Sequence, residues 1–173
     1  MNDAVDYGMS ARHRALRFFV WIGVFFSGIA LGAKMFDLIV LGSAWGASPP
    51  ESLTLMPYGP HYPLNPGDFF QPLSIPGAIT DVAVFILGWK TPVRYRIWVS
   101  LPLILFIIIW IATPTLFWPM IRELYNAGQG RGSAENIGAV VNRWMVLDSM
   151  RTVLIAIGFF AFIKAISQPI PKS

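Results

Sequence analysis

Four long apolar runs constrain what this chain can fold into. They cover residues 17–45, 73–89, 97–118 and 144–166. A helix needs about 20 predominantly apolar residues to cross the hydrocarbon core of a bilayer, so each run predicts one transmembrane helix. The composition agrees, because 55% hydrophobic and 13% charged residues leave too little polar surface for an ordinary soluble domain. We therefore expect an all-α integral membrane protein, a four-helix bundle that forms one transmembrane domain over residues 1–173.

Residues 46–72 predict a long proline-rich loop between the first and second spans. The segment contains seven prolines and neither Lys nor Arg. Because proline disrupts both helices and sheets, we expect no regular structure here and a second helix that begins near Ser74. The aromatic residues of this segment predict packing on the mouth of the bundle: Tyr58, Tyr62, Phe69 and Phe70. A lid over the bundle and a stiff connector both fit this pattern.

The distribution of basic residues predicts the orientation of the chain in the membrane. Eight of them flank the predicted spans at one side: Arg12, Arg14, Arg17, Lys90, Arg94, Arg96, Lys164 and Lys172. Three flank the spans at the other side: Arg122, Arg131 and Arg143. By the positive-inside rule, both termini are expected to be cytoplasmic and the loop at 46–72 external. The basic residues form no soluble basic domain, so we expect membrane lipids as partners and no nucleic acid.

Five ionisable residues fall within the predicted spans, where a charged side chain is costly and usually functional. They are Lys34, Asp37, Asp81, Asp148 and Arg151. Asp148 and Arg151 are three residues apart and share a helix face. Because the first helix runs outward and the fourth runs inward, we expect Lys34 to pair with Asp148. Asp37 is then expected to pair with Arg151, which leaves Asp81 without a partner.

Two interpretations of these five residues stay open at the level of sequence. In the first, the pairs lock the helices together, since polar side chains stabilise helix contacts in lipid. In the second, they line a polar pocket in which Asp81 or Asp148 is a general base and Lys34 or Arg151 stabilises an anion. The five residues are therefore the candidate catalytic residues.

The sequence predicts neither a metal nor a cofactor. It has no Cys, and its two histidines, His13 and His61, are expected on opposite sides of the membrane. No Glu-x-x-His pattern of the kind found in di-iron bundles is present. A carboxylate site formed by Asp37, Asp81 and Asp148 would be opposed by the neighbouring Lys and Arg.

Glycine spacing on the first helix indicates close helix packing. Gly28 and Gly32 form a small-xxx-small arrangement that lets another backbone approach. A homodimer is one interpretation, and packing within a bundle this small is the favoured one.

Several tryptophans fall near the predicted ends of the spans. They are Trp45, Trp89, Trp98, Trp118 and Trp144. Indole rings are enriched at membrane interfaces, so each is expected to lie in an aromatic belt, with stacking on a ligand as the alternative.

The last third of the chain carries a resemblance to a known family. Its residues are Thr113 and Pro114, the stretch 119–124, Asn142-Arg143-Trp144, Leu147, Asp148 and Arg151. This pattern resembles the anthrone-oxygenase-like membrane proteins, a widespread bacterial family also described as a domain of unknown function. That family has Trp, His and Arg at this spacing. Trp144 and Arg151 match here, whereas Asp148 stands in the position of the His.

The resemblance implies a four-span protein of the bacterial inner membrane. It also implies oxygenation of lipophilic polycyclic anthrones to quinones without a metal, after a protein base removes a proton from carbon. The alternative function is a non-catalytic accessory or scaffold subunit of a larger membrane complex. A transporter is less favoured, because four helices leave little room for alternating access and no inverted repeat is visible.

Overall fold

The computed structural model describes residues 10–58, 62–131 and 136–169. This described part is all-helical and contains no strand. Four of its helical segments are long and apolar enough to cross a membrane: Ala11–Trp45, Pro66–Gly88, Val93–Gly128 and Ile137–Ser167. All four predicted spans are therefore present as helices, and each begins earlier in the sequence than the apolar run alone indicated.

Two of the long segments are composite helices. The first consists of α1 (Ala11–Phe36), the π-helical turn η1 (Asp37–Leu41) and α2 (Gly42–Trp45). The third consists of α4 (Val93–Ala112), the π-helical turn η3 (Thr113–Phe117) and α5 (Trp118–Gly128). The second and fourth are the single helices α3 (Pro66–Gly88) and α6 (Ile137–Ser167). A short 3-10 helix, η2 (Glu51–Leu55), lies between α2 and α3.

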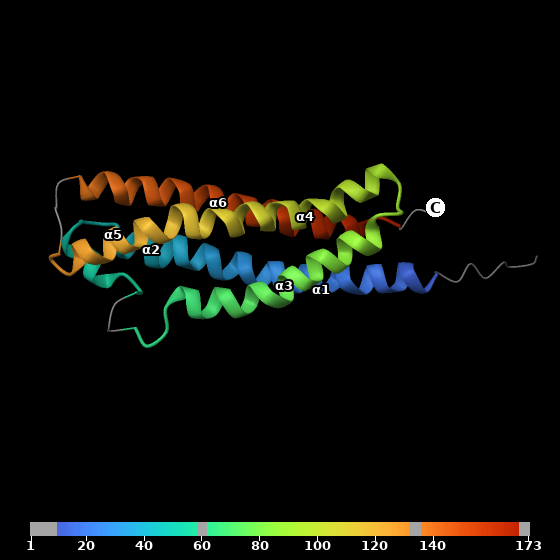
Figure 1. Cartoon of the computed structure of the whole chain (residues 1–173), viewed down its shortest axis with the longest axis horizontal. Coiled ribbons are helices and arrows are strands. Elements are labelled where there is room, and N and C mark those ends of the chain that lie inside the picture. The colour runs from blue at the N-terminus through green and yellow to red at the C-terminus, as the bar shows by residue number, and fades with distance from the viewer. Residues whose placement is uncertain (1–9, 59–61, 132–135, 170–173) are drawn as a thin grey trace, which may run out of the picture.

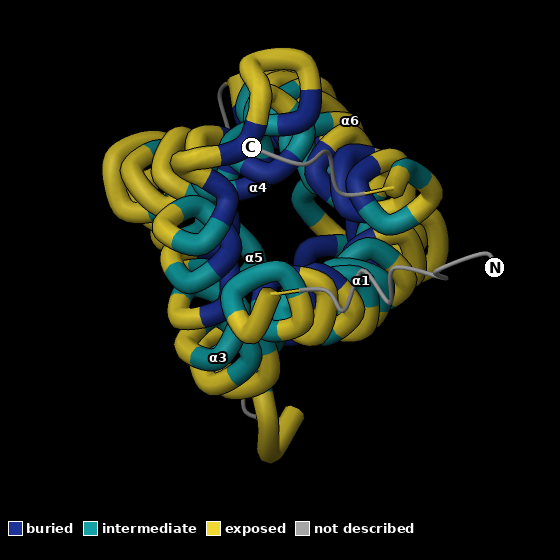
Figure 2. Tube along the Cα trace, turned by 90° about the vertical axis from the view of Figure 1, so that its right-hand side faces the viewer, coloured by how far each residue is buried: buried dark blue, intermediate teal, exposed yellow. Residues whose placement is uncertain are grey.

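The four long segments form an antiparallel bundle. The helix α1 packs against α3 and α6, and α4 packs against the same two helices, so the four close into a ring (Figures 1 and 2). Buried positions face the inside of this ring (Figure 2). We call the end where α1 begins and α6 ends the terminal end, and the opposite end, which carries residues 46–58 and 62–65, the loop end (Figure 1).

The prediction that residues 46–72 contain no helix is wrong for 51–55, which form the 3-10 helix η2, and for 66–72, because α3 begins at Pro66 rather than near Ser74. The Asn65 side chain accepts hydrogen bonds from the backbone N–H groups of Gly67 and Asp68, at 2.8 and 3.3 Å. Asp68 Oδ2 in turn accepts from the Asn65 backbone N–H at 2.9 Å, which completes a capping box. Pro66 occupies the first helical position, where a missing amide proton has no cost.

The π-helical turn η3 explains how the third segment continues past Pro114. Proline has no amide proton and its ring crowds the preceding turn, so an unmodified α-helix would kink or end there. The wider turn Thr113–Phe117 accommodates Pro114, and the helix continues for another three turns as α5. Such insertions are frequent at functional sites. Both η1 and η3 lie in the half of the bundle near the loop end.

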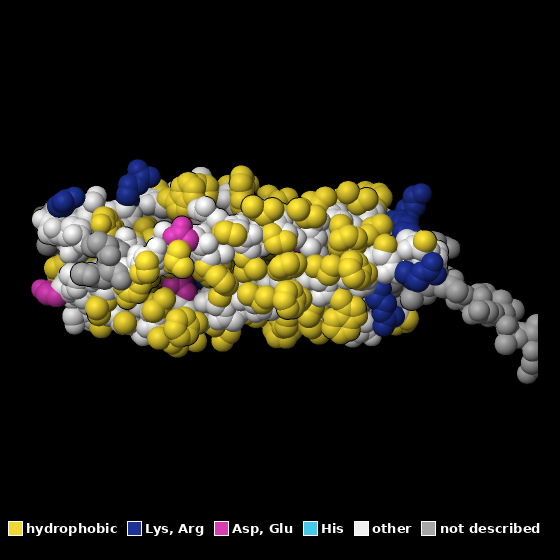
Figure 3. Space-filling model, turned by 90° about the horizontal axis from the view of Figure 1, so that it is seen from below, with side chains coloured by type: hydrophobic (Ala, Val, Ile, Leu, Met, Phe, Trp, Pro, Cys, Tyr) yellow, Lys and Arg dark blue, Asp and Glu magenta, His cyan; other side chains and the backbone are white. Residues whose placement is uncertain are grey.

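Two apolar cores fill the bundle. The loop-end core consists of Trp45, Leu53, Met56, Phe117, Met120, Leu124, Ile137, Val141 and Trp144. The terminal-end core consists of Leu16, Val20, Val84, Tyr95, Val99, Phe162 and Ala165. Hydrophobic side chains also cover the outer face of the bundle shown in Figure 3, between basic groups at its ends. An apolar exterior over a packed interior is the arrangement that a lipid environment permits.

Two tryptophans depart from the predicted aromatic belts. Trp45 and Trp144 are buried in the loop-end core, where their rings pack edge to face with centroids 4.8 Å apart. Trp89 and Trp118 are exposed, as a belt position requires. A position near the end of an apolar run does not distinguish these cases, because the direction of the side chain follows from helix packing.

Glycines on α1 mark where α6 approaches closely. A Cβ added at Gly28 would lie 3.3 Å from the Phe159 ring, which agrees with packing inside the bundle, whereas Gly32 faces open space. The tightest contact is at Gly23, where a Cβ would lie 2.5 Å from the buried Phe162 ring. The close contact between α1 and α6 therefore depends on Gly23 more than on the Gly28 and Gly32 pair.

Replacing Gly23 by alanine is expected to lower the free energy of unfolding by about 1–3 kcal/mol, because the methyl group overpacks the contact with Phe162. Gly32→Ala is the matched control and is expected to raise it by about 0.5–1 kcal/mol, since alanine favours the helix and meets nothing there. Chemical unfolding of both variants in the same detergent measures the difference. If the two variants were equally stable, the close contact between Gly23 and Phe162 would be contradicted.

Candidate functional site

Four of the five predicted site residues meet in one charged cluster, which we define as Lys34, Asp37, Asp148 and Arg151. The Lys34 ammonium lies 2.8 Å from Asp148 Oδ2 and 2.5 Å from Asp37 Oδ2. The Arg151 guanidinium donates to Asp148 Oδ1. The predicted pairing of Lys34 with Asp148 is confirmed. The predicted pairing of Asp37 with Arg151 is wrong, because Asp37 binds Lys34 one turn earlier on its own helix.

Asp148 is the centre of the charged cluster. Its side chain is 0% exposed and lies between the two cations, one from the first long helix and one from its own helix. The contact of Oδ2 with Lys34 is an ion pair without the alignment of a hydrogen bond. Two carboxylates and two cations make the cluster formally neutral, which is the condition for keeping charges in an apolar interior.

Aromatic rings surround the two cations of the cluster. The Lys34 nitrogen lies 5.5 Å from the ring centroid of Trp144 and 5.9 Å from that of Phe70. The Arg151 guanidinium carbon lies 3.9 Å from the ring centroid of Phe117, the last residue of η3. Ring faces attract cations most strongly where water is excluded, so these contacts help to hold Lys34 and Arg151 in place.

Tyr58 brings the loop at 46–65 to the charged cluster. Its side chain packs on the loop-end core, and its phenol is within electrostatic reach of Asp37, Arg151 and Asp148. Burial raises the pKa of the Tyr58 phenol, and the negative charge of Asp37 adds to this increase. Tyr58 is therefore a neutral hydrogen-bond donor at physiological pH. Tyr58 therefore lies beside the charged cluster at its loop end, and the lid and the connector both stay predictions.

A groove of about 360 Å³ reaches the charged cluster from the side of the bundle. One wall comes from the end of α1 and from η1, with Ala33, Phe36, Asp37 and Leu41. The facing wall comes from the loop and the start of α3, with Pro57, Tyr62, Leu64, Asn65, Pro66, Phe69 and Phe70. Asp37 is the one charged residue among these described lining residues and is 8% exposed. Asp37 is thus the member of the cluster that the groove reaches.

Asp81 does not join the charged cluster. It lies eleven residues after Phe70 on α3, which corresponds to about 16 Å along a helix. It is one turn from Val84 in the terminal-end core, and no ion pair involves it within the described part of the chain. Asp81 is therefore not part of the same site.

Three aromatic residues of the site were not assigned to the charged cluster from the sequence. Phe70 was expected only to pack on the mouth of the bundle, and Phe117 is an apolar residue in an apolar run, where nothing in its sequence context distinguishes it. Trp144 carries a clearer signal, because it lies four residues before Asp148 and therefore on the same helix face. Trp144 Nε1 and Arg151 Nε are buried without hydrogen-bond partners among the described residues, so the site holds unused donors.

A metal site would need several His, Cys, Asp or Glu side chains close together. Within 10–58, 62–131 and 136–169, no three side chains of His, Cys, Asp or Glu lie close enough together to hold a metal ion. His61 and Lys172, which the sequence places on opposite sides of the membrane, lie outside the described residues. In the charged cluster the two carboxylates are already bound to cations, which disfavours a divalent metal at that position.

The site combines a carboxylate at a groove, a buried ammonium bound to it, and a wall of aromatic rings. This arrangement can take a proton from a lipophilic molecule and stabilise the anion that results. Comparison with protein-family models, curated proteins and solved structures finds no match to this chain.

Proposed function

We propose that this protein is a membrane-embedded oxygenase that acts on lipophilic, anthrone-type aromatic molecules at the charged cluster. The observation that carries the proposal is the groove that ends at Asp37, whose carboxylate is bound by the buried Lys34 ammonium at 2.5 Å. The groove is about 360 Å³, within the range of small-molecule sites in proteins. The resemblance of the segment from Trp144 to Arg151 to anthrone-oxygenase-like proteins supports the same reaction class.

The structure favours Asp37 as the general base. Asp148 is fully buried between Lys34 and Arg151, so a substrate carbon has no path to its oxygens. Asp37 lines the groove and has only Lys34 as an ionic partner among the described residues. Asp148 and Arg151 are then positioning residues that hold Lys34 beside Asp37. The proposed base is therefore Asp37, instead of the Asp148 or Asp81 expected from the sequence.

The proposed reaction is balanced with molecular oxygen as the oxidant. Asp37 removes a proton from the methylene carbon of the anthrone, and Lys34 stabilises the resulting enolate. The carbanion transfers two electrons to O2 and forms a C–O bond, which gives a peroxide anion that Asp37 protonates. Loss of the second hydrogen from the same carbon, with cleavage of the O–O bond, leaves a carbonyl group and water. One oxygen atom enters the quinone and the other leaves as water.

Access from the lipid follows from the exposure of the groove rim. Leu64 is 73% exposed, and Phe36 and Phe69 are about half exposed on either side of the groove. Exposed apolar side chains of this kind suit the hydrocarbon region rather than water. A lipophilic substrate would therefore reach Asp37 by moving sideways out of the membrane.

Basic residues support an orientation with the terminal end in the cytoplasm. The described residues at that end include Arg12, Arg14, Arg17, Lys90, Arg94, Arg96 and Lys164. The loop end has Arg122, Arg131 and Arg143. By the positive-inside rule we expect the groove to lie in the outer half of a bacterial inner membrane.

Oxygen uptake by the purified protein tests the proposal directly. With an anthrone as substrate, the expected result is consumption of one O2 per substrate and formation of the matching quinone. Substrates that lack an acidic C–H position serve as the matched negative control. Absence of turnover over a panel of polycyclic ketones, with the protein shown to be folded, would contradict the proposed reaction.

A non-catalytic role in a larger membrane complex is the second candidate. The observation that favours it is that Asp148 binds Lys34 and Arg151 at once and so joins the first and fourth long helices, which gives the buried charges a structural role without any chemistry. Purification in a mild detergent distinguishes the two candidates. Recovery of stoichiometric membrane partners supports the accessory role, whereas a monodisperse single chain with turnover supports the enzyme.

A further inference from the structure

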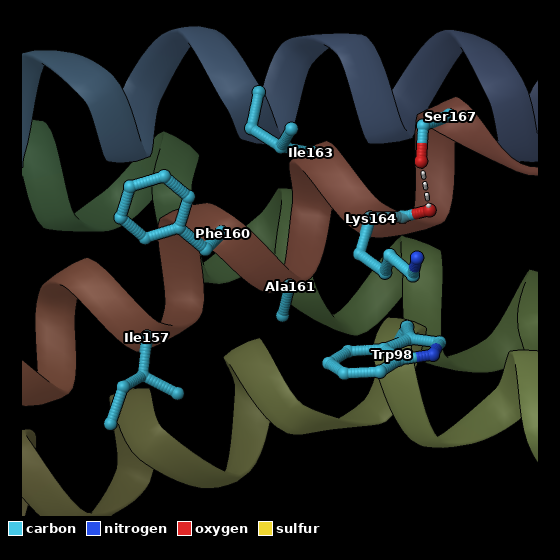
Figure 4. A pocket seen from close by; sticks show the side chains of 7 residues that line it. All are labelled: Trp98, Ile157, Phe160, Ala161, Ile163, Lys164 and Ser167. Carbon is cyan, nitrogen blue, oxygen red and sulfur yellow. Dashed lines mark hydrogen bonds between the residues drawn. The ribbon is translucent and has the colours of Figure 1, made fainter.

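A second groove lies between α4 and α6 near the terminal end, in the opposite half of the bundle from Asp37. Its volume is about 430 Å³. Ile157, Phe160 and Ala161 of α6 form its apolar part, and the Trp98 ring of α4 lies across from them (Figure 4). Ala161 is buried and ends in a single methyl group. An extended apolar chain fits this part of the groove.

The polar groups of this groove are confined to one end. Lys164 and Ser167 lie in the last turns of α6, which ends at Ser167. Ile157 is seven residues before Lys164, or about 10 Å along the helix. The groove therefore presents a hydrocarbon surface followed by a cation and a hydroxyl, in the same order as the acyl chain and headgroup of a phospholipid.

Among the described basic residues at the terminal end, Lys164 is the one that lines this groove and can bind an anion there. Its ammonium has no ion pair or hydrogen bond among the described residues, and its backbone carbonyl accepts from the Ser167 hydroxyl at 3.0 Å. Arg96, in contrast, donates to the Trp89 carbonyl and lies 5.3 Å from the Trp89 ring. An anion in the groove would gain a charge partner without displacing an existing one.

The charge of the terminal end favours an anion. The described residues that frame this end, 10–20, 84–100 and 160–169, contain the seven basic residues named above and neither Asp nor Glu. Figure 3 shows basic side chains at this end of the face that it draws. Basic pockets between helices at a cytoplasmic membrane surface bind acidic headgroups, and each basic group contributes about 1 kcal/mol.

We propose that the groove between α4 and α6 binds one anionic phospholipid of the surrounding leaflet. Its acyl chain lies along Ile157, Phe160 and Ala161, and its phosphate contacts Lys164. The site needs the bundle to be in a membrane but does not depend on the reaction at Asp37. A lipid held there would bridge α4 and α6 at the end where no loop joins them.

Native mass spectrometry of the full chain tests this proposal. The protein is equilibrated in mild detergent with equal amounts of phosphatidylglycerol and phosphatidylcholine that have identical acyl chains. The wild-type protein is expected to retain one phosphatidylglycerol in preference to phosphatidylcholine. Lys164→Gln is expected to lower that retention about fivefold, as expected for the loss of one basic group, and Lys164→Arg is expected to keep it.

Arg94→Gln is the matched control, because Arg94 is an exposed basic residue at the same end but outside the groove. It should retain phosphatidylglycerol as the wild type does. Equal losses in Arg94→Gln and Lys164→Gln would overturn the site in favour of general surface charge. Equal retention of the two lipids by the wild type would overturn its selectivity for an anion.

Discussion

Replacing Asp148 by asparagine is expected to lower the free energy of unfolding by about 3 kcal/mol, because it leaves Lys34 and Arg151 buried without their shared anion. A single hydrogen bond between helices in lipid contributes much less, about 0.6 kcal/mol on average. The larger value applies here because Asp148 serves two cations and is fully buried. Unfolding in detergent, followed by circular dichroism, measures the loss.

Glu123→Gln is the matched control for charge removal. Glu123 is exposed and has no ion pair among the described residues, so its substitution is expected to change stability by less than about 0.5 kcal/mol.

Adding Lys34→Met to Asp148→Asn restores a neutral cluster. The double variant should lose less stability than the sum of the two single variants. A stable Asp148→Asn protein would refute the central position of Asp148.

Asp37→Asn is expected to lower the rate of the proposed oxygenation by at least about 100-fold, the usual contribution of a general base. The carboxamide keeps the shape of the side chain but cannot take the proton from carbon. Stability should fall less than in Asp148→Asn, because Lys34 keeps its contact with Asp148. Oxygen uptake and unfolding, measured on the same preparation, separate the loss of chemistry from the loss of fold.

Asp81→Asn provides the matched control for Asp37→Asn. It removes another carboxylate from a span, but at a position about 16 Å along α3 from the ring of Phe70 that faces the cluster. Turnover should stay within a few-fold of the wild type. If Asp81→Asn abolished turnover and Asp37→Asn did not, the base would be Asp81 and the groove at Asp37 would not be the active site.

Much of the fold is predictable because lipid imposes a simple rule on sequence. An apolar run of sufficient length must be helical, since no water is present to satisfy its backbone. The ends of the helices were less predictable. Residues 66–72 contain two prolines, a pattern that predicts a loop. Asn65 and Asp68 nevertheless form a capping box, and α3 begins at Pro66. Pro66 favours this start as well, because proline at the first helical position loses no hydrogen bond and already has a helical φ.

The candidate site was predictable only in part. Charged residues inside an apolar run stand out, so Lys34, Asp37, Asp148 and Arg151 were identified from the sequence alone. Their pairing was half right, because the two helices bring Lys34 to Asp148 while Asp37 binds Lys34 within its own helix. Phe70, Phe117 and Tyr58 were not assigned to the cluster, because the sequence around an aromatic residue does not indicate which charged side chain it will contact.

The sequence by itself determined the four long helices and the presence of charges within them, because both follow from local composition. Tertiary structure decided which of these charges is accessible. Asp37 and Asp148 are both aspartates on long apolar helices that share Lys34 as a partner. Only the packing of α1, α3 and the loop places Asp37 at a groove and leaves Asp148 enclosed. Accessibility depends on contacts between segments far apart in the chain, which no local pattern encodes.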